Sequence, residues 1–249
     1  MSRLLFILCL LCNSSAFSEV TRKEFAIVKQ ALHKSFEALK SSESEVLYIN
    51  RLIPGLDEDY WWKVPGEDAS YVRTESEGRI EHNIYLMGGL ARSSEISVEG
   101  LALIGCHELG HGLAGHPRKE GSLSSTEGQS DYFATKICLP IVLKNISTHT
   151  KFKVRPIYRE LCSVQREYKQ NLCYRMFFAL ESEIYIFKLK DPEVKFAAHS
   201  EEVSLNLNLS PYYYPEPQCR LDTMINGILN LDRPECWFPN GARNGEGRI

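Results

Sequence analysis

The sequence predicts an α+β fold, in which a small antiparallel or mixed sheet is combined with several helices and a helical extension toward the C-terminus. Apolar residues recur at intervals of three to four in several long segments, which is typical of amphipathic helices. Shorter segments that indicate strands fall between residues 46 and 87. Of the 249 residues, 43% are hydrophobic and 24% are charged, which is ordinary for a globular protein.

Residues 1–18 are expected to be a signal peptide that is cut after Ser18. Arg3 precedes an apolar run that is too short to span a membrane, and small residues stand at the expected cleavage site. A lipoprotein signal ending at Cys12 is the alternative, but the residue before this cysteine is a leucine where a small residue is usual. We therefore expect an exported protein, either periplasmic or secreted.

The first helix is expected to begin at a capping box formed by Thr21 and Glu24, and to run for about five turns as far as residues 41–44. Its apolar stripe consists of Phe25, Val28, Leu32, Phe36 and Leu39. The strands that follow are expected at residues 46–53, 60–64, 71–74 and 79–87.

A second helix is expected from an N-cap at Ser97 to residues 115–117, where glycine and proline end it. A loop at 119–126 then leads to a third helix, which starts at Glu127 and ends near Pro140. The expectations for the rest of the chain are a mostly helical stretch at 155–189 interrupted at 171–173, an ordered irregular segment at 212–217, and a frayed tail at 239–248.

Residues 19–249 are expected to form one domain with a disulfide-stabilised C-terminal region. Six cysteines remain after the signal peptide: Cys106, Cys138, Cys162, Cys173, Cys219 and Cys236. An even number of cysteines behind a signal peptide indicates an oxidising compartment. We expect Cys219 to pair with Cys236, whereas a Cys106–Cys138 bridge requires that the two helices cross closely.

The charge of the chain excludes one class of partner. There are 29 basic and 32 acidic residues, which give a formal net charge of −3, and the basic residues form no stripe. We therefore expect no nucleic-acid partner. No apolar run after residue 18 approaches the length of a membrane span.

The second predicted helix carries the motif His107-Glu108-Leu109-Gly110-His111. Positions i and i+4 of a helix lie on one face, so both imidazoles can bind a single Zn²⁺. Glu108 can then act as the general base toward the water of the metal site. A catalytic zinc site also needs a third protein ligand and an open position.

Three residues compete for the third ligand position. His116 lies outside the register in which a third histidine usually follows this motif, and Asp131 is a less common type of ligand. Glu127 is the expected ligand, because Glu127 and Asp131 share a helical face. One carboxylate can then bind zinc while Asp131 orients a ligand imidazole. The alternative is that both are solvated acidic residues at a helix N-terminus, where they are favoured in any case.

Residues 107–116, which read HELGHGLAGH, and the segment from Glu127 to Ala134 resemble the two motifs of glutamate-zincin metallopeptidases of the CAAX-protease and HtpX-like family. The resemblance covers about residues 85–139. It implies a zincin-like fold with an HExxH active-site helix and a second ligand helix. The chain lacks the transmembrane helices of the membrane-bound members, so the resemblance implies a soluble, exported bacterial relative.

The function expected from these residues is zinc-dependent endopeptidase activity on a peptide or an unfolded protein. The alternative is a catalytically inactive zincin-fold binding protein of the cell envelope. The strand at 80–87 is expected to pair with the substrate backbone. The candidates for stabilising the oxyanion are His199, Arg220 and Tyr213, among which the sequence does not decide. Cys106 is expected to point away from the metal, because neighbouring residues on a helix point about 100° apart.

Overall fold

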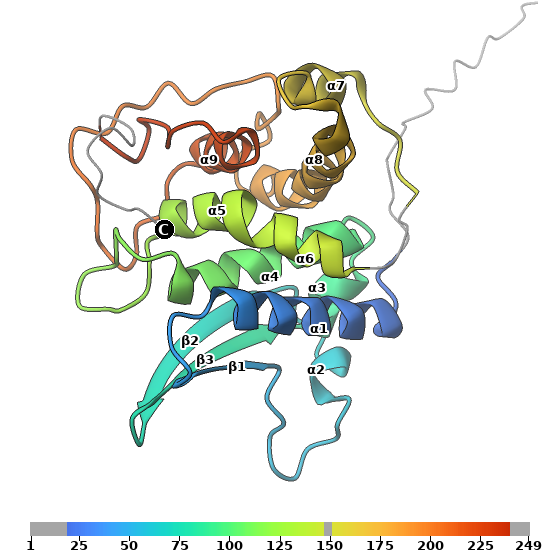
Figure 1. The fold of residues 1–249 in the computed structure, drawn as a ribbon, viewed down its shortest axis with the longest axis vertical. Coiled ribbons are helices and arrows are strands. Elements are labelled where there is room, and N and C mark those ends of the chain that lie inside the picture. Colours follow the sequence, from blue (N-terminus) through green and yellow to red (C-terminus); the bar gives the residue numbers. More distant parts are fainter. Residues whose placement is uncertain (1–18, 147–150, 240–249) are drawn as a thin grey trace, which may run out of the picture.

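The structure is a computed structural model that describes residues 19–146 and 151–239 (Figure 1). The expected signal peptide and residues 240–248 of the expected tail lie outside the described residues. A small sheet forms one layer, α1 (Arg22–Leu39) and α4 (Val98–Leu113) pack against it, and the later helices lie on the far side of α4. The expected mixed α+β class is therefore confirmed.

The sheet has three strands in the order β1-β3-β2, with β1 (Glu45–Ile49), β2 (Ala69–Ser76) and β3 (Arg79–Leu86). β1 runs parallel to β3, and β2 runs antiparallel to it through a tight turn at Glu77 and Gly78, both with positive φ. β3 is thus paired on both sides, whereas no described strand pairs with the outer edge of β2.

Two strand predictions need correction. β1 ends at Ile49 because Asn50 adopts a left-handed conformation (φ 57°) and its side chain bonds the backbone of Leu86. Residues 60–64 do not form a strand but contain the helical turn α2 (Tyr60–Lys63). In this turn Trp62 packs against Phe25 in α1, with ring centroids 5.4 Å apart. The aromatic run has strand propensity, but tertiary packing decides its conformation.

The first and second predicted helices agree with the structure. Thr21 and Glu24 form the capping box of α1, and Ser97 accepts a hydrogen bond from the Gly100 N–H at the start of α4. The short helix α3 (Gly88–Arg92) between the sheet and α4 was not predicted from the sequence. Almost every residue of α4 is buried, so this helix lies at the centre of the molecule.

The third predicted helix continues beyond its expected end. α5 (Glu127–Phe133) passes into a π-helical turn (η1, Ala134–Cys138) and then α6 (Leu139–Asn145). Pro140 therefore lies in the first turn of α6, where a missing N–H is tolerated. The helices do cross closely, because Cys106 and Cys138 form a disulfide with their Cα atoms 5.6 Å apart.

The C-terminal region consists of α7 (Pro156–Cys162), α8 (Glu167–Lys188) and α9 (Pro217–Leu229). The expected interruption at 171–173 is wrong: α8 is continuous there, and the break lies between Cys162 and Glu167. A Cys162–Cys173 disulfide joins α7 to α8. The predicted Cys219–Cys236 disulfide is confirmed, and it joins α9 to the segment behind it.

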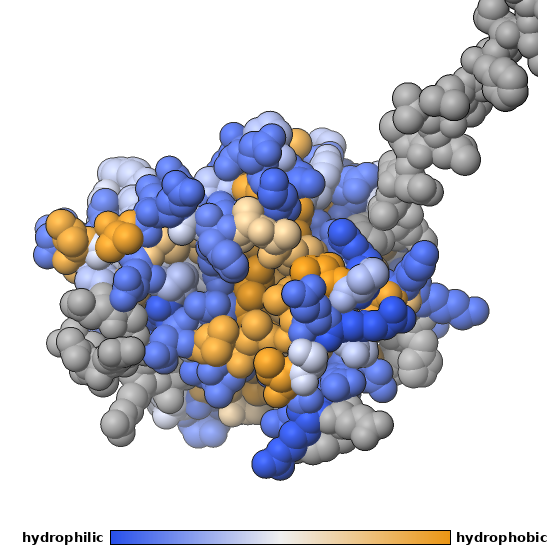
Figure 2. All heavy atoms as spheres, turned by 90° about the horizontal axis from the view of Figure 1, so that it is seen from above, coloured by the Kyte–Doolittle hydropathy of each residue, from blue (hydrophilic) through white to orange (hydrophobic). Residues whose placement is uncertain are grey.

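The main hydrophobic core extends from α1 and the sheet through α4 to α8 and α9, and a smaller cluster surrounds Trp237. Seen from the side of the C-terminal helices, hydrophobic residues gather in the middle of the face and hydrophilic residues surround them (Figure 2). Within the described residues, no helix combines the length and apolar character that a membrane crossing requires. The three disulfides suggest an oxidising compartment.

Candidate metal centre

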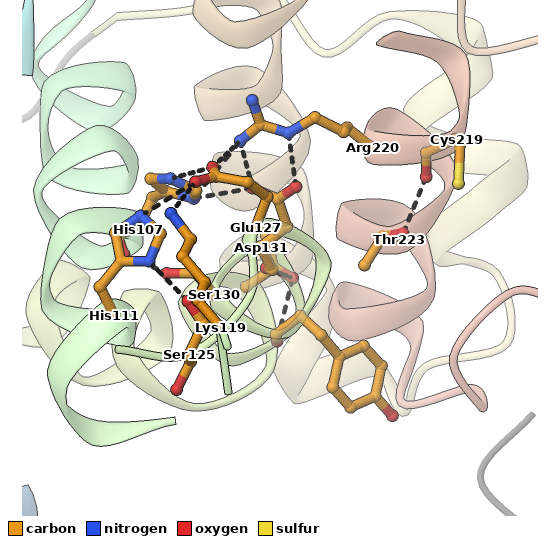
Figure 3. Close-up of polar contacts among 12 residues, drawn as sticks. His107, His111, Lys119, Ser125, Glu127, Ser130, Asp131, Cys219, Arg220 and Thr223 are labelled. Atoms are coloured by element: carbon orange, nitrogen blue, oxygen red, sulfur yellow. Dashed lines mark hydrogen bonds and ion pairs between the residues drawn. The ribbon is translucent and has the colours of Figure 1, made fainter. Parts of the chain in front are cut away.

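A close crossing of α4 and α5 brings the two predicted motifs together. A Cβ atom added to Gly110 would lie 2.5 Å from Ser130 Oγ, so only glycine fits at this crossing. The Ser130 hydroxyl donates a hydrogen bond to the backbone carbonyl of His107. The first turn of α5 therefore faces the side chains that α4 presents (Figure 3).

His107, His111 and Glu127 form a buried group whose potential ligand atoms all lie within 4.8 Å of one another. His107 Nε2 lies 3.3 Å from Glu127 Oε2, and His111 Nε2 lies 3.6 Å from Glu127 Oε1. The two imidazole planes are nearly perpendicular, with centroids 4.8 Å apart. This group could hold a metal ion.

The other nitrogen of each imidazole has a partner of its own. His107 Nδ1 lies 2.7 Å from Asp131 Oδ1, and His111 Nδ1 donates to the Ser125 carbonyl at 3.0 Å. These contacts fix the orientation of both rings and leave both Nε2 atoms directed toward Glu127. Such outer contacts accompany most histidine ligands of metal sites, so the residues fit a metal ion.

Arg220, from α9, joins this network behind His107. Its Nε donates to Asp131 Oδ2 at 2.7 Å and its Nη2 to Asp131 Oδ1 at 2.8 Å. Its Nη2 also lies 3.7 Å from Glu127 Oε2. The guanidinium thus faces two buried carboxylates, and its chemical role here is to hold Asp131 in place beside His107 (Figure 3).

The electrostatics of the group differ sharply between the two histidines. Burial alone would lower the pKa of His107, but the charge of Asp131 and the hydrogen bonds to Asp131 and Glu127 outweigh it and raise this pKa to about 10. Burial lowers the pKa of His111 to about 4, and the charge of His107 adds to this effect. Burial opposes ionisation of Glu127, but His107 holds its pKa well below the usual range. Without a cation, His111 is therefore neutral, Glu127 is ionised and His107 is protonated, so a metal ion bound by all three residues would have to displace the proton of His107.

Glu108 lies in the same cleft as the three possible ligands. Its side chain is buried, and burial raises the pKa of its carboxyl group to about 7. A carboxyl group with this pKa can accept and return a proton near neutral pH.

The cleft has a volume of about 560 Å³. One wall is the start of β2, with Ala69, Ser70 and Tyr71. The expectation that residues 80–87 pair with a substrate is wrong, because both edges of β3 are occupied by β1 and β2. The strand that borders the cleft with an edge left open by the described strands is β2.

A chain of hydrogen bonds joins this wall to the other two strands of the sheet. The Tyr71 hydroxyl lies 2.8 Å from His82 Nδ1, and His82 Nε2 lies 3.3 Å from Glu45 Oε2. A Cβ atom on Gly112 would lie 2.4 Å from His82 Nδ1, so a side chain there would push β2 and β3 away from the metal group.

The other residues that the sequence suggested for the site lie outside the metal group. His116 is exposed and borders a separate cavity of about 620 Å³, and His199 is 83% exposed beside Asp222. In the part of the chain that the structure describes, Tyr214 is one of the residues that line the cleft, whereas Tyr213 is not. Cys106 is bonded to Cys138 rather than directed at the metal group.

Three further residues of the cleft were not found from the sequence. Lys119 Nζ donates to Glu127 Oε1 at 2.7 Å, and Glu183 and Tyr214 contribute side chains from α8 and from the segment before α9. Burial raises the pKa of Glu183 to about 7. None of the three belongs to a recognisable motif, and only the fold brings them together.

No known protein family, curated protein or solved structure matches this chain. The resemblance to the glutamate-zincin motifs therefore rests on the residues of α4 and α5 alone.

Proposed function

We propose that this protein is a zinc-dependent endopeptidase with a zincin-like fold that acts on peptides or unfolded proteins. One observation carries the proposal: His107, His111 and Glu127 converge in a cleft that also contains Glu108. Each of these side chains comes from one of two crossing helices, α4 and α5.

The donor set supports zinc as the metal. Two imidazole nitrogens and one carboxylate are the protein ligands of a large class of catalytic zinc sites, which keep a further position open. A zinc ion held by these residues supplies Lewis acidity toward water and toward the peptide carbonyl. Asp131 and the Ser125 carbonyl keep the two ligand rings oriented.

Glu108 supplies the proton transfers of the proposed reaction. Its carboxylate accepts a proton from the attacking water as the new C–O bond forms at the peptide carbonyl. It then gives that proton to the leaving nitrogen as the C–N bond breaks, so that one water is consumed and a carboxylic acid and an amine are released. The pKa of about 7 suits both directions of transfer.

The edge of β2 supports an extended peptide as the substrate. An unpaired strand edge offers a row of backbone N–H and C=O groups to which a peptide can add as a further strand. β2 begins on the wall of the cleft, so a peptide bound along it passes beside Glu108 and the metal group.

The proposed location is the periplasm or the extracellular space. Residues 1–18 have the pattern of a signal peptide, and the three disulfides fit an oxidising compartment.

The test uses purified protein that spans residues 19–249. Its zinc content is measured by elemental analysis, and cleavage of an unfolded protein is followed with and without a chelator. We expect about one zinc per chain and cleavage that a chelator abolishes and zinc restores. Bound zinc without cleavage under any condition would instead favour the inactive zincin-fold binding protein.

A further inference from the structure

Two lysine ammonium groups and a tyrosine ring line the same cleft as the proposed zinc ligands. Lys119 lies in the loop before α5, Lys190 follows α8, and Tyr214 precedes α9. Lys119 Nζ lies 5.8 Å and Lys190 Nζ lies 5.5 Å from the centroid of the Tyr214 ring. One ring thus gathers two positive charges from distant segments, and the proposed hydrolysis uses neither of them.

Lys119 already binds a carboxylate in this structure. Its ammonium donates to Glu127 Oε1 (Figure 3), and its side chain is only 15% exposed. An ion pair that is shielded from water is stronger than an exposed one, because the effective dielectric constant around it is lower. An ammonium has three N–H donors, so the bond to Glu127 leaves donors for a second carboxylate.

Lys190 supplies the second charge from an exposed position. Among the described residues, no carboxylate forms an ion pair with its ammonium, which lies near the Tyr214 ring. At the wall formed by β2 the charges are negative, since Glu67 and Asp68 line the cleft just before β2. A peptide in the cleft therefore meets acidic groups at one place and basic groups at another.

We propose that Lys119, Lys190 and Tyr214 form a subsite for a carboxylate group of the substrate, so that this protein favours acidic peptides. The proposal rests on the proposed peptidase function. The carboxylate accepts hydrogen bonds from both ammonium groups, and the Tyr214 ring holds the two lysines together. An aspartate or glutamate side chain and the C-terminal carboxylate of a peptide offer the same two oxygens.

Calorimetric titration of the zinc-loaded Glu108→Gln protein measures peptide binding without cleavage. The probes are ten-residue peptides of uncharged residues in which a single glutamate, glutamine or lysine is placed at each position in turn. Each peptide is made with a free and with an amidated C-terminus. We expect roughly tenfold tighter binding for a carboxylate than for its neutral counterpart, as a charged hydrogen bond typically gives. If affinity increases only with the glutamate peptides, the subsite binds a side-chain carboxylate. If affinity increases only with a free C-terminus, it binds the terminal carboxylate. Equal affinity for all of these peptides would overturn the proposal.

Variants assign the preference to these side chains. Lys190→Met and Lys119→Met should each reduce the preference for a carboxylate, and Tyr214→Ala should reduce it while Tyr214→Phe retains it. Lys188→Met is the matched control, because Lys188 lies on the same helix end but borders another cavity. An undiminished preference in the double lysine variant, with its fold verified by circular dichroism, would refute the subsite.

The failure of this proposal is distinguishable from the failure of the proposed function. If the protein binds acidic peptides but cleaves none, the subsite stands and the peptidase function fails. If it cleaves peptides without a preference for charge, the peptidase function stands and the subsite fails.

Discussion

Replacing Asp131 with asparagine separates the contribution of this carboxylate to folding from its contribution to metal binding. Asp131 is fully buried, accepts two hydrogen bonds from Arg220 at 2.7 and 2.8 Å, and lies 2.7 Å from His107 Nδ1. Asparagine has nearly the same size and retains one oxygen acceptor. The substitution therefore removes mainly the charge that lies between two buried cationic groups.

The burial and the close partners of Asp131 place it among the buried ion pairs whose loss has a known size. Removing one partner of a buried ion pair costs about 3–5 kcal/mol. In a protein of this size each kcal/mol changes the Tm by about 2–4 °C, so the metal-free variant should unfold roughly 6–20 °C lower than the wild type. Losing the partner of a ligand imidazole reduces metal affinity by about 10–100-fold, so zinc should still bind to the Asp131→Asn variant.

Circular dichroism gives the Tm of the metal-free proteins, and competition with a zinc-binding dye gives the affinity. Glu75→Gln is the control, since Glu75 lies exposed on β2 and pairs only at the surface with Arg73. It should change neither quantity appreciably. An Asp131→Asn variant with the Tm and the zinc affinity of the wild type would refute this account of the network.

The remaining predictions concern the base, the ligands, the pH dependence and the covalent link. Glu108→Gln should retain zinc by elemental analysis and lose roughly 10²–10⁴-fold of its activity in a peptide cleavage assay. Activity equal to that of the wild type would contradict the role of Glu108 as the base. Glu127→Ala should abolish tight zinc binding in the dye assay, whereas His116→Ala should leave it intact because His116 is exposed. The reverse result would contradict the assignment of Glu127 as the third ligand. The ionised form of Glu108 is the proposed base, and burial raises its pKa to about 7. A plot of kcat/KM against pH should therefore rise through an acid limb. Its midpoint should lie at or somewhat below pH 7, because a bound cation lowers the pKa of Glu108. Replacing Cys106 and Cys138 together with serine should lower the free energy of unfolding by about 2–4 kcal/mol in denaturant titrations, and an unchanged midpoint would contradict it.

The acid dependence of the Asp131 network has a definite sign. Burial acts to raise the pKa of Asp131, but Arg220 outweighs burial and lowers it. A lowered folded-state pKa gives a stabilisation that is complete above the unfolded value of about 3.9 and is lost as the pH falls through the folded value. The Tm difference between the wild type and Asp131→Asn should therefore shrink below about pH 4.

The parts of the site that could be predicted from the sequence depend on local helical geometry. The spacing of His107 and His111 places both on one face of any helix, and Glu127 and Asp131 share a face for the same reason. The capping box at Thr21 likewise depends on residues three positions apart. Such relations hold whatever the rest of the chain does.

The parts that could not be predicted depend on contacts between distant segments. Lys119, Glu183 and Tyr214 reach the cleft from three separate segments, and no spacing in the sequence relates them. Residues 60–63 form a helical turn because Trp62 packs against Phe25, which lies far away in the sequence. The pairing of β3 on both sides likewise follows from the topology of the sheet, so the edge strand that borders the cleft could not be chosen in advance.

The Cys106–Cys138 disulfide closes a covalent ring, with a sequence separation of 32, that contains every residue of the metal group. His107, Glu108, His111, Glu127 and Asp131 all lie between its two cysteines in the sequence. In the oxidised chain these side chains cannot diffuse far from one another even when the protein is unfolded, so their effective concentration stays high. Oxidation thus holds the residues of the proposed metal site within one macrocycle, and reduction opens it to an ordinary flexible chain. Assembly of the proposed metal site would thereby be linked to the redox state of the compartment in which the protein folds.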